Sequence, residues 1–344
     1  MNDDHLNEWY QHRRNHKEAL DVTTIFNGVI AGNRVDVSNA ITLIESNRKQ
    51  DRVKSKELIK CCLEYSGNAL RIGITGVPGV GKSTFIESFG VGLVKAGKKV
   101  AVLSIDPSSE SSKGSILGDK TRMERLSVLD HAFIRPTASG STLGGVARYT
   151  KEAIIICEAA GFDVILVETV GVGQSEITVN SMVDFFLLLM LPTAGDELQG
   201  IKRGIIEMAD AIVVTKSDGE LVDAAKRAVN TYKNAFHFFA PNENGWQPKV
   251  LSVSNLNDKD VLRVWEVITS FHSMTLQNGG FDKKRREQRL HGWMEQLKSV
   301  VFEHFVDENK YALESLQKDV AENKMHIYDA VDLIVSSYFN QNKK

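Results

Sequence analysis

The chain has 344 residues, of which 42% are hydrophobic and 25% charged, as in an ordinary soluble globular protein. Its 42 Lys and Arg nearly balance its 44 Asp and Glu, so the formal net charge is -2. This balance gives no whole-chain reason to expect nucleic acid or an anionic membrane as a partner. The longest apolar run, 185–191, is too short to span a bilayer, and the polar N-terminus lacks the apolar core of a secretory signal. We therefore expect a cytoplasmic protein, with an organelle matrix as the alternative, that binds neither nucleic acid nor membrane.

The first zone, residues 1–68, is predicted to be a helical N-terminal extension. It is polar and charged, and apolar residues recur at helical spacing within 40–44 and 58–63. We expect helices that pack on the core of the protein, with a separate binding module as the alternative.

The second zone, residues 69–276, alternates short apolar, β-branched runs with helical patterns. Runs of this kind are typical of a parallel sheet covered on both faces, so we predict an α/β fold with a mostly parallel, doubly wound sheet. The expected strands are 71–76, 99–105, 132–136, 163–168, 184–191, 211–215 and 249–253, and the expected helices include 82–95, 145–160 and 221–236.

The third zone, residues 277–344, is predicted to be a helical C-terminal extension. Its boundary signal is Asn278-Gly279-Gly280. We interpret a basic run at 283–286 as a solvated helix face. An apolar stripe from Trp293 to Phe305 is predicted to form part of the core or of a dimer interface.

Three cysteines, Cys61, Cys62 and Cys157, are spaced neither as a disulfide framework nor as a paired metal site. Cys157 ends an apolar run, which favours a small buried hydrophobe. A reducing compartment suits this cysteine usage.

The strongest motif is a glycine-rich loop that matches G-x-x-x-x-G-K-[ST] in full. An expected strand enters it and an expected helix leaves it, which is the context that a phosphate-binding loop requires. Glycines let successive backbone N–H groups turn toward phosphate oxygens, and the helix N-terminus adds partial positive charge. The nucleotide-binding residues of this loop are predicted to be Gly76, Val77, Pro78, Gly79, Val80, Gly81, Lys82, Ser83 and Thr84.

A bound triphosphate needs Mg²⁺, and three residues are candidates to ligate it. Ser83 ends the loop motif, Asp106 follows the expected strand 99–105, and Glu168 ends the expected strand 163–168. Strand carboxyl ends meet the ligand crevice of an open α/β sheet, so these oxygens should converge there. Lys82 and Glu168 are predicted to be catalytic, and Lys202 or Arg122 would complete the charge clamp.

Base recognition is predicted at Val213-Val214-Thr215-Lys216-Ser217-Asp218, which resembles the N-K-x-D guanine signature. The Asp218 carboxylate would accept hydrogen bonds from guanine, whereas adenine offers no such donor pair, so we expect GTP and GDP as ligands. The Lys216 stem would cover the base plane. Thr215 replaces the usual Asn, which removes an amide that could brace the loop. Further contacts to the nucleotide are expected from Ser254, Asn255 and Leu256.

With these motifs in order, the chain resembles the methylmalonyl-CoA mutase-associated GTPases, the MeaB/ArgK-like family of metallochaperone-type P-loop GTPases. The resemblance covers essentially residues 20–275. Its stretches are 73–84, 105–109, 114–123, 168–176 and 192–202, of which 168–176 and 195–202 are specific to the family. Thr215 and Asn255, where the family usually has Asn and Ala, depart from the pattern.

The resemblance implies a role that the residues alone do not. Such proteins bind an adenosylcobalamin-dependent acyl-CoA mutase, by default methylmalonyl-CoA mutase, and use GTP to gate cofactor delivery and to protect the mutase. It also implies a homodimer built partly through the C-terminal helices. Residues 106–123, 168–176 and 193–202 would be three switches.

No catalytic base is evident, so we expect hydrolysis to be slow alone and faster when a partner orders the switches. The main alternative is a metal-delivery GTPase for another metalloenzyme, which would need a Cys/His cluster near the switches. The other hypotheses are a small-molecule kinase and a signal-recognition-type GTPase.

Overall fold

The computed structural model describes residues 21–46, 48–106, 123–138, 143–169, 175–193, 203–236, 244–255 and 257–341. The chain forms two compact units, Met1–Arg285 and Arg286–Lys344. No helix among the described residues has the length and apolar character needed to cross a membrane.

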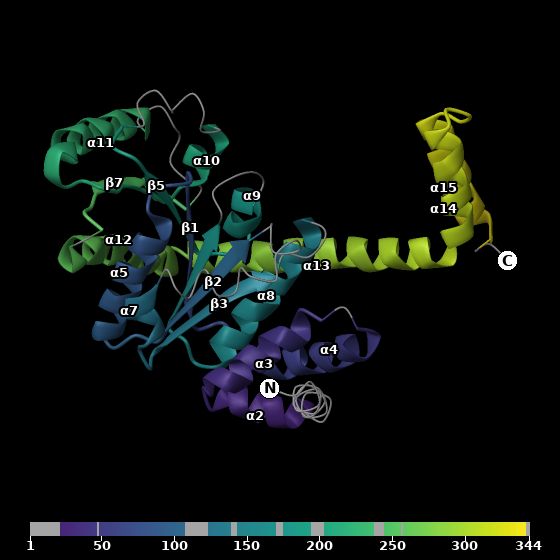
Figure 1. Cartoon of the computed structure of the whole chain (residues 1–344), viewed down its shortest axis with the longest axis horizontal. Coiled ribbons are helices and arrows are strands. Elements are labelled where there is room, and N and C mark those ends of the chain that lie inside the picture. The colour runs from purple at the N-terminus through teal and green to yellow at the C-terminus, as the bar shows by residue number, and fades with distance from the viewer. Residues whose placement is uncertain are drawn as a thin grey trace, which may run out of the picture. The chain divides into compact units, whose positions relative to one another are not determined.

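The first unit is built on a seven-stranded sheet (Figure 1) with the order β3-β2-β4-β1-β5-β6-β7. All six pairings between neighbouring strands are parallel. The predicted parallel α/β fold is therefore confirmed, and each of the seven expected strands is present. They are β1 (Leu70–Gly76), β2 (Val100–Asp106), β3 (Ala132–Ala138), β4 (Val164–Thr169), β5 (Phe185–Met190), β6 (Ala211–Val214) and β7 (Lys249–Ser252).

Both faces of the sheet are buried, because side chains alternate along each strand. In β5, Phe185, Leu187 and Leu189 belong to one core, while Phe186, Leu188 and Met190 belong to cores on the opposite face. The first core includes residues of α5 (Lys82–Lys95), α7 (Glu124–Ser127) and α12 (Asp258–Gln277). The opposite face is covered by α8 (Leu143–Ala159), α9 (Ser175–Asn180), α10 (Arg203–Met208) and α11 (Val222–Phe236), the last preceded by the 3₁₀ turn η2 (Gly219–Leu221).

The N-terminal helices share one of these cores. Buried apolar residues of α2 (Val22–Ile30), α3 (Arg34–Ile44) and α4 (Lys49–Leu63) cluster with residues of α8 and of the sheet. Arg135 of β3 adds a polar link, since its guanidinium pairs with Glu45 at 2.7 Å. This extension therefore packs on the sheet.

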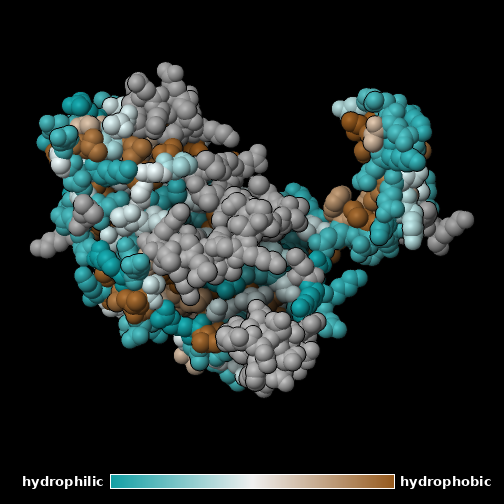
Figure 2. Space-filling model, in the orientation of Figure 1, coloured by the Kyte–Doolittle hydropathy of each residue, from teal (hydrophilic) through white to brown (hydrophobic). Residues whose placement is uncertain are grey.

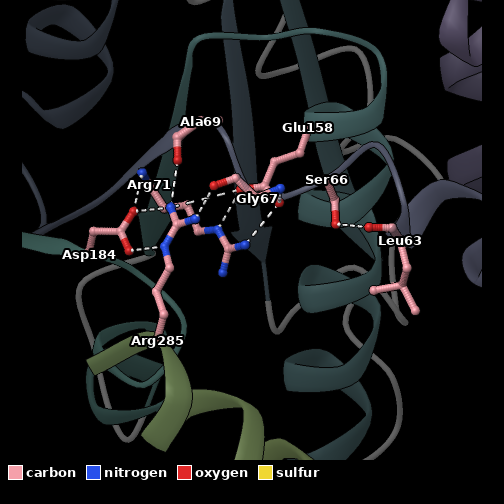
Figure 3. Close-up of polar contacts among 8 residues, drawn as sticks. All are labelled: Leu63, Ser66, Gly67, Ala69, Arg71, Glu158, Asp184 and Arg285. Carbon is pink, nitrogen blue, oxygen red and sulfur yellow. Dashed lines mark hydrogen bonds and ion pairs between the residues drawn. The ribbon is translucent and has the colours of Figure 1, made fainter. Parts of the chain in front are cut away.

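A buried charge cluster lies where β1 and β5 begin (Figure 3). Arg285, which is 7% exposed, donates from Nε and Nη2 to the Asp184 carboxylate at 2.8 and 2.7 Å. It also donates to the carbonyls of Gly67 and Ala69. Arg71 pairs with Glu158 at 2.8 Å beside it.

The prediction that the run 283–286 is simply a solvated helix face is thus wrong in part. The helix α13 (Gly280–Glu308) presents Lys284 and Arg285 to the sheet, where Lys284 donates to the Asp184 carbonyl at 2.8 Å. Lys283 and Arg286 are exposed. Helical periodicity therefore divides the run between two faces.

The second unit consists of the rest of α13 together with α14 (Lys310–Ala321) and α15 (Ile327–Gln341). Phe305 meets Tyr338 edge-on, with ring centroids 5.0 Å apart. Many large apolar side chains are nevertheless exposed, and Figure 2 shows brown apolar surface among the teal of these helices. On α13 they are Leu290, Trp293, Met294, Leu297, Val300, Val301 and Phe302.

Candidate functional site

The glycine-rich loop connects the carboxyl end of the central strand β1 to the start of α5, as expected. Gly76 has a φ of 154°, and a Cβ there would lie 2.5 Å from the carbonyl oxygen of Leu189. Gly81, the N-cap of α5, has a left-handed φ of 92°. Because L side chains strain both positions, the two glycines are needed to shape this loop. The free N–H groups of the first turn of α5 therefore border the loop, which is the arrangement that binds phosphate.

Lys82 bends back over the loop that it ends. Its Nζ donates to the carbonyl of Gly76 at 2.8 Å and to that of Val77 at 3.3 Å, and the residue is 9% exposed. Burial lowers the pKa of Lys82 from its ordinary value, against the opposing attraction of Glu168 and Glu176. The ammonium is thus held inside the loop by carbonyls that phosphate oxygens can replace.

Two of the predicted magnesium ligands lie together. Ser83 donates from Oγ to Oε1 of Glu168 at 3.3 Å, and Ser104 donates to Oε2 at 3.4 Å. Glu168 is 8% exposed near the end of β4, and the strand register places Ser104 of β2 directly beside it. Asp106 is the last residue of β2, but its side chain lies outside the described part of the chain.

Sequence reasoning did not identify four buried polar residues here, of which Ser104 has just been described. Thr169 donates its hydroxyl to that of Thr75 at 2.8 Å, so the strand ends that lead into the phosphate loop and into 170–174 are bonded. Both hydroxyls are buried. Glu176, 2% exposed, adds negative charge that acts on Lys82. The sequence feature that could have identified these residues is their position, because each lies beside or within one of the motifs described above.

Thr215 braces the phosphate loop despite replacing the usual Asn. Its buried hydroxyl donates to the Val80 carbonyl at 2.7 Å and lies 3.3 Å from that of Met190. Thr215 lacks the amide of the usual Asn, but its shorter hydroxyl reaches the phosphate loop from the end of β6.

The remaining base-recognition residues meet at the ends of β6 and β7. Ser254 donates its hydroxyl to Oδ2 of Asp218, which orients that carboxylate. Lys216 is exposed and has a φ of 52°, a conformation that costs a non-glycine residue about 1 kcal/mol. The Asn255 side chain points elsewhere, since its Nδ2 donates to the Gly81 carbonyl at 3.3 Å.

Several predicted residues lie outside the described part of the chain. They are Lys202, Arg122 and Leu256, together with most of the switch segments, namely 107–122, 170–174 and 194–202. The cysteine prediction concerns a described region and is confirmed for Cys157, which is fully buried. Burial raises the pKa of Cys157 and raises that of Cys62 to about 12.

Known proteins resemble this chain over most of its length. The family model described as methylmalonyl-CoA mutase-associated GTPase MeaB matches residues 37–310. A putative GTPase of Caulobacter vibrioides is 50% identical over 276 residues, which cover 80% of this chain and 84% of the relative. A mitochondrial methylmalonic aciduria type A homolog of Mus musculus is 44% identical over 299 residues, covering 84% and 72%. The crystal structure of a LAO/AO transport system kinase has a TM-score of 0.72 and 33% identity, and covers 93% of this chain and 97% of that one.

These matches agree with the geometry of the site. The family model spans the sheet, the phosphate loop and both base-recognition loops. The Caulobacter vibrioides relative, which is named a putative GTPase, shares half of its aligned residues with this chain. The protein therefore binds guanine nucleotide and hydrolyses GTP, and it belongs to the methylmalonyl-CoA mutase-associated GTPase family.

Proposed function

We propose that this GTPase gates the delivery of adenosylcobalamin to an acyl-CoA mutase and protects that mutase from inactivation. The mutase that we propose is methylmalonyl-CoA mutase. The observation that carries the proposal is the family match over 37–310, because that family is described by its association with this mutase. The mouse relative, which is named for methylmalonic aciduria, adds support.

In the nucleotide site that we propose, the backbone of 76–84 holds the phosphates. Lys82 exchanges the carbonyls of Gly76 and Val77 for β- and γ-phosphate oxygens, and its charge offsets the negative charge that develops during hydrolysis. Asp218, oriented by Ser254, accepts from guanine, while the Lys216 stem covers the base. Lys202 would complete the clamp of positive charge around the phosphates.

The oxygens at the mouth of the loop fit Mg²⁺. Ser83 and Glu168 supply a hydroxyl and a buried carboxylate that already face one another, and Mg²⁺ prefers such hard oxygen ligands. Asp106 ends the adjacent strand β2 and would add a second carboxylate. When bound, the ion supplies positive charge to the β- and γ-phosphates.

We further propose that the protein is a homodimer formed in part by the second unit. Support comes from its exposed apolar side chains, among them Trp293 at 61% and Phe302 at 66%. Large exposed apolar patches mark interaction surfaces. Sedimentation of the full chain and of Phe302→Asp checks this, since the variant should sediment as a monomer; an unchanged sedimentation coefficient would rule out this surface.

The decisive experiment is single-turnover GTP hydrolysis with and without methylmalonyl-CoA mutase. We expect the mutase to accelerate hydrolysis and to co-purify with the protein when a non-hydrolysable GTP analogue is present. Lys82→Ala is the control, because it should lose both responses. Equal hydrolysis rates with and without the mutase would sink the gating proposal.

The metal-delivery alternative calls for a Cys/His cluster near the switches. The described residues contain no group of three or more His, Cys, Asp or Glu side chains placed to hold a metal ion. No observation favours that alternative over the mutase-associated role.

A further inference from the structure

The loop after β7 contacts the phosphate loop through Asn255. Asn255 is 6% exposed, and its Nδ2 donates to the carbonyl of Gly81 at 3.3 Å. The two residues are so close that a Cβ on Gly81 would lie 3.0 Å from that Nδ2. Ser88, further along α5, donates its hydroxyl to the Asn255 carbonyl at 2.8 Å. Asn255 is thus fixed to α5 through both its side chain and its backbone.

The carbonyl that Asn255 holds determines where the next amide points. A peptide unit is planar and trans, so its C=O and the following N–H point in opposite directions. The Gly81 carbonyl accepts the first helical hydrogen bond of α5, from the Phe85 N–H at 2.9 Å, and Asn255 is its second donor. Holding this carbonyl toward Asn255 therefore turns the Lys82 N–H the other way. Thr215 acts likewise on the preceding peptide, since it holds the Val80 carbonyl at 2.7 Å and so orients the Gly81 N–H. These two N–H groups lie where the loop motif binds phosphate.

We propose that Asn255 is a positioning residue for the phosphates: it holds the Gly81 carbonyl so that the Lys82 N–H faces the nucleotide, in concert with Thr215 on the peptide before it. The proposal rests on the phosphate site at 76–84 proposed above. The sequence predicts a contact between Asn255 and the nucleotide, and the alternative to a positioning role is a direct contact to the base. The Asn255 Oδ1 is buried and has no hydrogen-bond partner among the described residues, so the amide acts through its Nδ2.

A positioning role and a base-contact role for Asn255 predict different effects of the nucleotide base on the loss of affinity. A residue that positions phosphate amides should weaken GTP, GDP and inosine triphosphate equally when it is removed. A residue that accepts a hydrogen bond from the exocyclic amine of guanine should weaken only the guanine nucleotides when it is removed, because hypoxanthine keeps the ring N–H and the ring carbonyl of guanine but lacks that amine. Losing one neutral hydrogen bond should reduce affinity about three- to tenfold.

The test is equilibrium binding of these three nucleotides to the full chain, to Asn255→Ala and to Asn255→Asp. Asn255→Asp keeps the side-chain volume but turns an acceptor toward the Gly81 carbonyl, so its loss should exceed that of Asn255→Ala. The matched control is Asn230→Ala, an exposed Asn on α11, which should bind normally. A loss confined to GTP and GDP, or no loss, overturns the proposal.

A double-mutant cycle with Ser88→Ala separates positioning from general destabilisation. If Ser88 acts by fixing Asn255, then Ser88→Ala should weaken all three nucleotides and add little to Asn255→Ala. Additive losses would overturn the proposal. Lys82→Ala tests the proposed phosphate site separately from the role of Asn255. Normal nucleotide binding by Lys82→Ala would refute the phosphate site itself. Defective binding by Lys82→Ala together with normal binding by Asn255→Ala would refute only the positioning role.

Discussion

Replacing Arg285 with Met removes a buried charge while keeping most of the aliphatic stem. The guanidinium donates four hydrogen bonds, two of them to Asp184 at 2.8 and 2.7 Å and two to the carbonyls of Gly67 and Ala69. Its carbon Cζ also lies 4.5 Å from the Phe281 ring centroid. Asp184, 1% exposed, would keep the Arg71 N–H at 2.8 Å but lose its closest cation.

The expected loss follows from this geometry. Breaking a buried ion pair by removing one partner costs about 3–5 kcal/mol, because the other charge is left without compensation. We expect Arg285→Met to lie within that range. The double variant with Asp184→Asn should lose less than the sum of the single losses, by about 1–3 kcal/mol, since it no longer buries an unpaired carboxylate.

The measurement is the free energy of unfolding in urea, followed by circular dichroism and by fluorescence of the buried Trp246. The control is the exposed neighbour, Arg286→Met, which should change stability by no more than about 0.5 kcal/mol. If Arg285→Met were as stable as Arg286→Met, the view that this cluster fastens α13 to the sheet would be refuted.

Three further outcomes are expected. Lys82→Ala should abolish GTP binding in a fluorescent-nucleotide titration; retained affinity would refute the role of Lys82. Thr169→Val strips the bond to Thr75 at 2.8 Å and should lower the free energy of unfolding by about 1–3 kcal/mol, with Thr169→Ser losing less. Burial raises the pKa of Cys62 from 9.0 to about 12 and also raises that of Cys157. The unfolded state therefore ionises first, and stability should fall above pH 9 by about 1.4 kcal/mol per pH unit and thiol. A Cys62→Ala/Cys157→Ala variant should show a shallower decline; an equal slope would contradict the assignment.

The sequence alone determined the features that depend on local pattern. Every expected strand is present because buried parallel strands read as continuous apolar runs, as Phe185–Met190 does. The phosphate loop was recognisable because its glycines, lysine and serine lie within one short segment whose geometry is set by neighbouring residues. The guanine signature could be read through Asp218 for the same reason.

Tertiary structure alone decided which distant groups meet. Asn255 reaches a carbonyl 174 positions away and Thr215 one that is 135 positions away, and no local pattern in the sequence predicts either contact. Arg285 and Asp184, 101 positions apart, form an ion pair that buries one residue of the basic run beside the sheet. Such contacts depend on strand order and on the crossovers between strands, and these follow from packing across the whole domain. A local pattern fixes where a side chain stands on its own helix or strand, but only the assembled sheet fixes what stands opposite.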